Sequence, residues 1–243
     1  MNFTFNDKQS ELLYVEDGFV IPSFPKEVQY HSASHSDYRI RQRGILLPIE
    51  FEVPFVLRNK RDTLHRDDVI EEVTNLFYSD GPKWFSLKDS KWKVYGEFTG
   101  PFEVPKRIDT FTEITLRFVS SYACKFSKED KIQSGSSISI KTKSQVPTIP
   151  FIELTDVNTN DLQVSITGSD FNRLRLSTGS AANLPTKITI DIENEDIYET
   201  NSKVSIIKNL HIDSTFEDFK IKNEDVVITN NGTMKITYKE LML

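Results

Sequence analysis

Histidine and aspartate side chains gather at one place where they could bind a metal ion. His31, His35 and Asp37 lie close together, and imidazole and carboxylate groups are common zinc ligands. The four-residue spacing of the histidines brings them to one side only on a helix, and the serines among them do not favour a helix. We therefore predict a polar loop at this position and no metal site, because such short matches often arise by chance.

His65, Asp67 and Asp68 form a second group, which could transfer a proton. A catalytic pair needs a pocket and a partner within hydrogen-bonding reach, and the sequence indicates neither. Acids are favoured in the first turn of a helix, where the peptide dipoles present positive charge. We interpret these residues as the start of a helix.

Arg39, Arg41 and Arg43 alternate along the chain, so they would share one face of an extended segment. Such a row could pair with acids on a neighbouring subunit or bind phosphate. The simpler alternative is a solvated strand face. If subunits of this protein contact one another through polar residues, we expect these arginines to take part.

The motifs of common enzyme classes are absent from the sequence. It has no phosphate loop, no dinucleotide fingerprint, no His-Glu-x-x-His and no Gly-x-Ser-x-Gly. Cys124 is the single cysteine, which excludes an intrachain disulfide and a cysteine-based zinc site. It follows an apolar strand, so we predict a buried, unreactive thiol. We expect no catalytic, cofactor-binding or metal-binding residues, and no cofactor.

The most strongly patterned stretch lies between residues 45 and 118. Every odd position from 45 to 57 is apolar, which predicts a strand with one buried face, and Pro48 and Pro54 place that strand at an edge or at bulges. An amphipathic helix is predicted over about 63–79, ending at Asp80-Gly81-Pro82. Its apolar stripe should pack on the preceding strand, and consists of Val69, Val73, Leu76 and Phe77.

The flanking segments are less regular. Leu12–Val15 and Phe19–Pro22 are predicted to form a hairpin around Glu16-Asp17-Gly18, and residues 24–44 a loop or arm. Residues 127–137 are polar and are predicted to be a linker. Of the 27 aromatic residues, 21 precede residue 131, so the two halves have different core chemistry. We predict two domains, 1–130 and 131–243.

The second half shows only strand patterns. Short alternating segments with no long helical pattern predict an antiparallel β-sandwich. Pro147 and Pro150 suggest that the strand ending near Leu154 is an edge. Asn230-Asn231-Gly232 predicts a hairpin into the last strand. The remaining expected strands are at 138–140, 162–166, 174–176, 188–192, 197–198, 204–207, 216–221 and 226–228.

Charge and hydropathy exclude some partners. The net charge is -6, with acids and bases spread along the chain, which argues against specific nucleic-acid binding and against an anionic-membrane surface. No apolar run approaches the length of about 18 residues that a membrane span needs. The N-terminus lacks the pattern of a secretion signal, so we expect synthesis and folding in a cytoplasm.

The order of elements in 45–118 resembles that of siphophage distal tail proteins. A long strand is followed by a helix opened by Thr63-Leu64-His65-Arg66-Asp67-Asp68, then by Gly81-Pro82-Lys83-Trp84-Phe85, the turn Lys88-Asp89-Ser90, an aromatic strand over 92–98 and a strand over Phe111–Phe118. The resemblance implies a mainly β fold: an α+β N-terminal domain with one main helix on a sheet, and a C-terminal galectin-like antiparallel β-sandwich.

The resemblance also implies a function in the virion. Proteins of this family form a hexameric ring at the tail tip, between the major tail protein and the tail-tip fibre or lysin protein, and their sandwiches dock receptor-binding or other baseplate proteins. The competing hypothesis is a β-sandwich module for carbohydrate binding or adhesion. Residues 131–243 hold no tryptophan and a single histidine, His211, so we do not expect a galectin-type sugar site.

Overall fold

The computed structural model describes most of the 243-residue chain. The described residues are 1–24, 26–27, 30–32, 39–41, 45–58, 65–78, 80–108, 111–167, 172–179, 182–214, 216 and 218–243, with the backbone alone at 26–27, 30–32, 39–41, 45–46 and 111. The fold is mainly β with one α-helix in this part of the chain, as the sequence predicted. The chain divides into two compact units, Met1–Phe126 with Leu243, and Ser127–Met242. We propose that they are the two domains that the sequence predicts.

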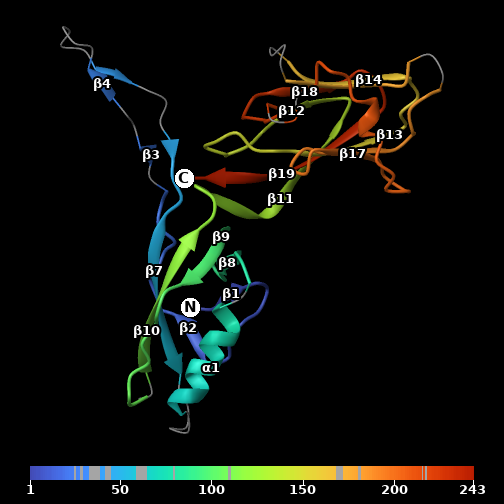
Figure 1. The fold of residues 1–243 in the computed structure, drawn as a ribbon. Coiled ribbons are helices and arrows are strands. Elements are labelled where there is room, and N and C mark those ends of the chain that lie inside the picture. Colours follow the sequence, from blue (N-terminus) through green and yellow to red (C-terminus); the bar gives the residue numbers. More distant parts are fainter. Residues whose placement is uncertain are drawn as a thin grey trace. The chain divides into compact units, whose positions relative to one another are not determined.

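The N-terminal unit is built on one antiparallel sheet (Figure 1). Its strands follow the order β1-β8-β9-β10-β7-β2. The outermost strands meet where the Val15 amide donates to the Met1 carbonyl over 2.9 Å, so the sheet curls toward closure. The bounds are Phe3–Phe5 for β1, Leu13–Val15 for β2, Glu50–Arg58 for β7, Lys83–Leu87 for β8, Trp92–Thr99 for β9 and Phe111–Ser120 for β10.

Helix α1, Arg66–Phe77, covers the core face of this sheet. The predicted stripe of Val69, Val73, Leu76 and Phe77 is buried, which confirms the helix and the face that it presents. The Phe77 ring lies 5.0 Å from Phe55 and 4.5 Å from Phe98, centroid to centroid. The helix therefore packs on β7, as predicted, and on β9 as well. Residues 63, 64 and 79 of the predicted helix lie outside the described residues.

The predicted hairpin around Asp17 is wrong in its second strand. The turn exists, with Gly18 at φ 92° and the Phe19 amide donating to the Glu16 carbonyl over 3.3 Å. Residues 19–24 nevertheless form no strand, and β2 pairs with β7 instead. The side chains of Ile21 and Phe24 are buried in the core, which accounts for the apolar pattern that suggested a strand.

The predicted strand over 45–57 is split into two strands. Ile45–Leu46 (β6) pairs with Lys26–Glu27 (β3), and β7 begins only at Glu50, after Pro48. Within the segment predicted as a loop or arm, Tyr30–Ser32 (β4) pairs with Arg39–Arg41 (β5). The described part of this segment is therefore a ladder of paired strands, more consistent with an arm than with an irregular loop.

The C-terminal unit is a β-sandwich of two sheets. One has the order β17-β16-β13-β19-β11, and the other β12-β18-β14-β15. Apolar side chains from both sheets form a single buried cluster, which is the interior of a two-layer sandwich. The bounds are Lys125–Gly135 (β11), Ser137–Ser139 (β12), Phe151–Thr155 (β13), Asp161–Ile166 (β14), Arg173–Ser177 (β15), Ile188–Asp191 (β16), Asp196–Glu199 (β17), Ile207–Asn209 (3-10 helix η1), Val226–Thr229 (β18) and Thr233–Met242 (β19).

Three predictions for this region are corrected by the structure. The predicted linker over 127–137 lies mostly in the long strand β11, which pairs with β19 despite its polar sequence. Strand β13 is not an edge, because it pairs with both β16 and β19, and Pro147 and Pro150 precede its first residue. Residues 204–207 and 218–221 are not strands, although Ser205 and Ile221 form isolated bridges.

The turn at Asn230-Asn231-Gly232 does not make the predicted hairpin. It carries the chain from β18 in one sheet to β19 in the other, and these two strands do not pair. The Asn230 and Asn231 carboxamide oxygens accept the backbone amides of Gln163 and Asn158 over 2.8 and 2.7 Å. Asn231 thus holds the loop before β14 in place, and Asn230 binds β14 itself.

Candidate assembly surfaces

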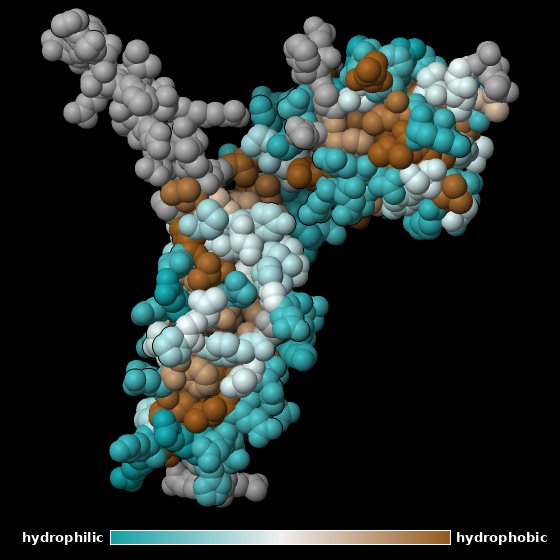
Figure 2. Space-filling view, in the orientation of Figure 1, coloured by the Kyte–Doolittle hydropathy of each residue, from teal (hydrophilic) through white to brown (hydrophobic). Residues whose placement is uncertain are grey.

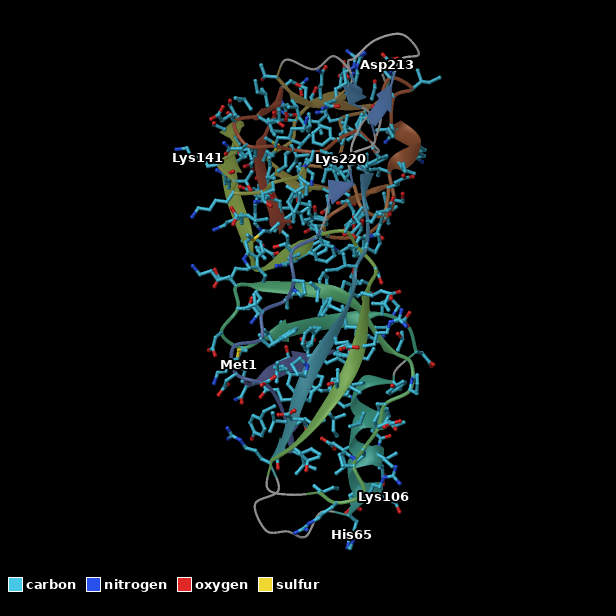
Figure 3. All side chains as sticks on the ribbon, turned by 90° about the vertical axis from the view of Figure 1, so that its left-hand side faces the viewer. Met1, His65, Lys106, Lys141, Asp213 and Lys220 are labelled. Atoms are coloured by element: carbon cyan, nitrogen blue, oxygen red, sulfur yellow. The ribbon has the colours of Figure 1, made fainter. Side chains whose placement is uncertain are left out.

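The structure describes the second group of histidines and acids in full and the first group only in part. His31 lies on β4, whereas His35 and Asp37 lie outside the described residues. Among the residues that the structure describes, no three His, Cys, Asp or Glu side chains are grouped so that they could hold a metal ion. The Asp68 carboxylate accepts the His65 amide over 3.1 Å, which caps α1. Figure 3 shows His65 at the free end of this helix, as the helix-start interpretation requires.

The arginine row is described only in part. The backbone of Arg39 and Arg41 belongs to β5, and Arg43 lies outside the described residues. A contact between subunits through these arginines stays a prediction.

Cys124 is half-buried, and burial raises the pKa of its thiol to about 11. A thiol with so high a pKa is almost entirely protonated at neutral pH, so it is a poor nucleophile.

A half-buried aromatic patch covers part of the sheet face opposite α1. Trp84 on β8 and Tyr95 on β9 lie directly across from each other, with ring centroids 4.9 Å apart. Phe126 lies 5.2 Å from Trp84 and 5.3 Å from Tyr122, whose side chain is 45% exposed. The Lys93 ammonium lies 4.0 Å above the Trp84 ring. Aromatic groups that keep exposed surface are typical of protein interfaces. In the sequence Trp84 alternates with the buried Phe85, which indicates an outward-facing ring but not its contact with Phe126.

Strand β7 has one open stretch of backbone. The Glu16 amide donates to the Pro54 carbonyl over 2.9 Å, on the side of β7 away from β10. Because backbone groups alternate sides along a strand, the N–H and C=O groups of the other even-numbered residues of β7 also point away from β10. Strand β2 covers only Phe55–Leu57 on that side. In the described part of the chain, the stretch from Glu50 to Val53 therefore has no neighbouring strand on the side away from β10. Pro54 is the residue just before the part of β7 that pairs with β2. The predicted edge position is wrong for the strand as a whole, because β7 lies between β10 and β2, but Pro54 lies just outside the three residues that pair with β2.

Two outer strands of the sandwich are covered by the chain itself. On β15, the Arg175 carbonyl accepts the His211 amide over 2.8 Å. On β17, the Ile197 carbonyl accepts the Ile206 amide over 2.7 Å, and the Glu199 amide donates to Val204. Covered edges cannot add a further strand, so this arrangement prevents unwanted pairing of sandwiches.

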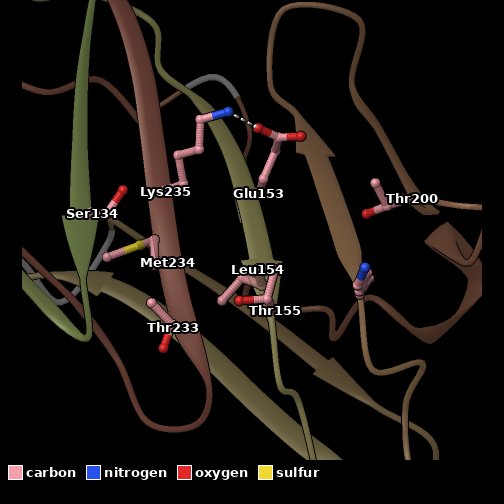
Figure 4. A pocket seen from close by; sticks show the side chains of 9 residues that line it. Ser134, Glu153, Leu154, Thr155, Thr200, Thr233, Met234 and Lys235 are labelled. Carbon is pink, nitrogen blue, oxygen red and sulfur yellow. Dashed lines mark hydrogen bonds and ion pairs between the residues drawn. The ribbon is translucent and has the colours of Figure 1, made fainter.

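A groove of about 350 Å³, lined by polar and apolar residues, lies over one sheet of the sandwich (Figure 4). Lys235 on β19 and Glu153 on β13 form an ion pair of 2.6 Å beside it, and threonine hydroxyls supply further donors and acceptors. Among the residues that the structure describes, none of those lining this groove is aromatic. The remaining lining residues are Ser134, Leu154, Thr155, Lys187, Thr200, Thr233 and Met234.

The outer face of the other sheet carries a network of exposed charges. Arg175 donates to both oxygens of Asp161, over 2.8 and 2.6 Å, and this pairing holds the pKa of the Asp161 carboxyl below its usual value. Arg173 pairs with Asp213 over 3.1 Å. Exposed ion pairs of this kind contribute little to the stability of the fold, so we interpret the network as part of the solvated surface. Figure 2 shows that polar residues dominate the visible face of the sandwich, with apolar patches between them.

The comparisons with known proteins show that the chain has the fold of phage tail-tip proteins. It aligns with the Dit (gp 19.1) protein of phage SPP1, described as a paradigm of the hub adsorption apparatus in phages that infect Gram-positive bacteria, at a TM-score of 0.79 and 15% identity. The alignment covers 100% of this chain and 99% of the SPP1 chain. Two structures of the phage P2 baseplate in its activated conformation, with Ca and with Sr, each match at a TM-score of 0.55 and 8% identity, covering 98% of this chain and 97% of theirs.

The fold that the chain shares with SPP1 Dit agrees with the resemblance to siphophage distal tail proteins that the order of elements in 45–118 suggested. Among solved proteins, the SPP1 Dit protein resembles the chain over both units. No protein-family model and no curated protein matches the sequence. No helix in the described residues is long and apolar enough to span a membrane.

Proposed function

We propose that this chain is a distal tail protein, a structural component of the tail tip of a long-tailed phage and not an enzyme. The observation that carries the proposal is the alignment with SPP1 Dit along the entire chain, which includes the helix-covered sheet and the sandwich. In this role the protein would be made in the cytoplasm of a bacterial host and would end in the virion.

The N-terminal units would form a homohexameric ring, which connects the major tail protein to the tail-tip fibre or lysin protein. A ring needs two different surfaces on each subunit that meet and close. The open backbone of Glu50–Val53 and the patch around Trp84 are two such surfaces. The net charge of -6 suits a ring through which DNA passes without being held. The sandwiches, whose outer strands β15 and β17 are covered, would dock receptor-binding or other baseplate proteins.

The ring can be tested by light scattering coupled to gel filtration, alone and after co-expression with the neighbouring tail proteins. Six copies of the 28.0 kDa chain have a mass of about 168 kDa. Glu52→Pro should reduce this to the monomer mass without lowering the melting temperature, because the Glu52 amide points to the open side and not into the β10 ladder. Glu113→Gln, an exposed change on β10, is the matched control. A monomer in every preparation, including the co-expressed one, would refute the ring.

The groove beside Lys235 and Glu153 favours a second candidate, a carbohydrate-binding or adhesion module. Hydroxyl-rich ligands suit its threonines and charged pair, although sugar sites usually include an aromatic platform. Strong hits on a glycan array that Lys235→Ala removes, together with a monomeric mass, would support this candidate over the ring.

A further inference from the structure

An open hollow of about 250 Å³ in the N-terminal unit contains a nearly buried lysine. Lys125 is only 6% exposed, and its ammonium donates to the Ile21 carbonyl over 2.8 Å. An ammonium group has three N–H donors, and Lys125 has no further hydrogen-bond partner and no ion pair among the described residues. A buried cation without a counter-charge is costly, so the hollow is suited to an anionic group.

The walls of the hollow are apolar and partly exposed. Phe19, Val20 and Ile21 contribute to them, and so do Leu87 of β8 and Trp92 of β9. Val20 is 73% exposed, so its side chain is available to an incoming group. The volume is below the range of about 300–1,000 Å³ that drug-sized ligands occupy, so the space fits one or two side chains.

Two further charged groups belong to the lining. The Met1 ammonium is already bound by the Val15 carbonyl and the Asp17 carboxylate. Asp89 is exposed and lies within the β8–β9 turn. Its carboxylate can accept a backbone amide from an incoming chain, while Lys125 supplies the cation.

We propose that this hollow is a docking site for a partner protein, and that it takes an extended segment in which a large apolar side chain adjoins a carboxylate. The apolar side chain fills the space between Val20 and Trp92, and the carboxylate pairs with the Lys125 ammonium. The burial of Lys125 and the exposure of Val20 support it without reference to the proposed tail function. A partner held in this way would be recognised by charge and by shape together.

The test is selection from a displayed random peptide library on the full-length chain. We expect enrichment of peptides with Leu, Ile, Met or Phe next to Asp or Glu. Lys125→Met should weaken their binding roughly tenfold or more, because it removes a hydrogen bond between charged groups. The control is Lys91→Met, an exposed lysine close in sequence that does not line the hollow.

A second variant guards against a folding defect in Lys125→Met. Val20→Asp changes an exposed side chain, so it should fold normally and lose the same peptides through repulsion of their carboxylate. The proposal is overturned if no peptide is enriched, if the enriched peptides are basic, or if peptides selected on the wild type bind both variants as well as they bind the Lys91→Met control.

Discussion

Replacing Gly96 by alanine should test how closely two strands of the N-terminal sheet pack. Gly96 lies on β9 opposite Ser120 of β10. A Cβ atom there would lie 2.1 Å from the Val119 carbonyl oxygen and 2.8 Å from two carbons of the Phe118 ring. Distances below 3.0 Å to backbone cannot be tolerated, so either the strands separate or Phe118 moves.

Phe118 has little freedom to move. Its ring lies 5.1 Å from Phe98, 5.2 Å from Phe51 and 5.6 Å from Phe85, and it is fully buried. Overpacking of a core typically costs about 1–3 kcal/mol, and the backbone clash places this variant at about 3 kcal/mol or more. For a unit of this size, the melting temperature should fall by roughly 10 °C or more.

Tryptophan fluorescence during thermal or urea unfolding is the appropriate assay, because both tryptophans, Trp84 and Trp92, belong to the N-terminal unit. Gly100→Ala is the matched control: a Cβ at Gly100 meets nothing within 4 Å, although φ is 80°. It should cost only about 1–2 kcal/mol, the penalty for a left-handed alanine. If Gly96→Ala is no more destabilising than Gly100→Ala, the proposed close approach of β9 and β10 is wrong.

Three further predictions concern other sites. Asn231→Ala should destabilise the sandwich by about 1 kcal/mol, because the Asn158 amide loses its acceptor; calorimetry should show this with the tryptophan transition unchanged. At pH 8, iodoacetamide should alkylate Cys124 on the order of 100-fold more slowly than it alkylates a free cysteine, since burial raises the thiol pKa to about 11; a rate near that of unfolded protein would contradict this. Burial lowers the pKa of Lys125 in the folded protein. Between this lowered pKa and the ordinary lysine pKa of about 10.4, the unfolded chain therefore binds more protons than the folded one, and the stability of the wild type relative to Lys125→Met should rise with pH. A stability difference between the two proteins that stays flat or falls with pH would count against the burial.

Local patterns predicted which face of each element is buried. In α1, and in strands such as β14 and β15, the apolar positions identified in the sequence are the buried ones. The helix cap also followed from local chemistry, because Asp68 and His65 are only three residues apart. Such features depend on neighbours along the chain, which the sequence displays directly.

Predictions about strand partners were less reliable. The Asp17–Gly18 turn and the Asn230–Gly232 turn both formed, yet neither joins two paired strands. A turn motif states how the backbone bends and not which strand lies beside it afterwards. Polar β11 was predicted as a linker because its sequence lacks alternation, but pairing with β19 makes it a strand.

The assembly surfaces and the lysine hollow could not be derived from the sequence. The patch around Trp84 and Phe126 joins side chains from separate strands, and Lys125 meets Ile21 across 104 positions. No local pattern records such a contact, because it depends on how the sheet curls.

From the sequence alone came the mainly β fold, the helix with its buried stripe, the order of elements and the absence of familiar catalytic motifs, since periodicity and turn chemistry act over a few residues. Tertiary structure alone decided which strands pair, which stretch of backbone stays open and which lysine is buried. These depend on contacts between distant segments, and the free energy of such contacts is gained only once the chain has folded.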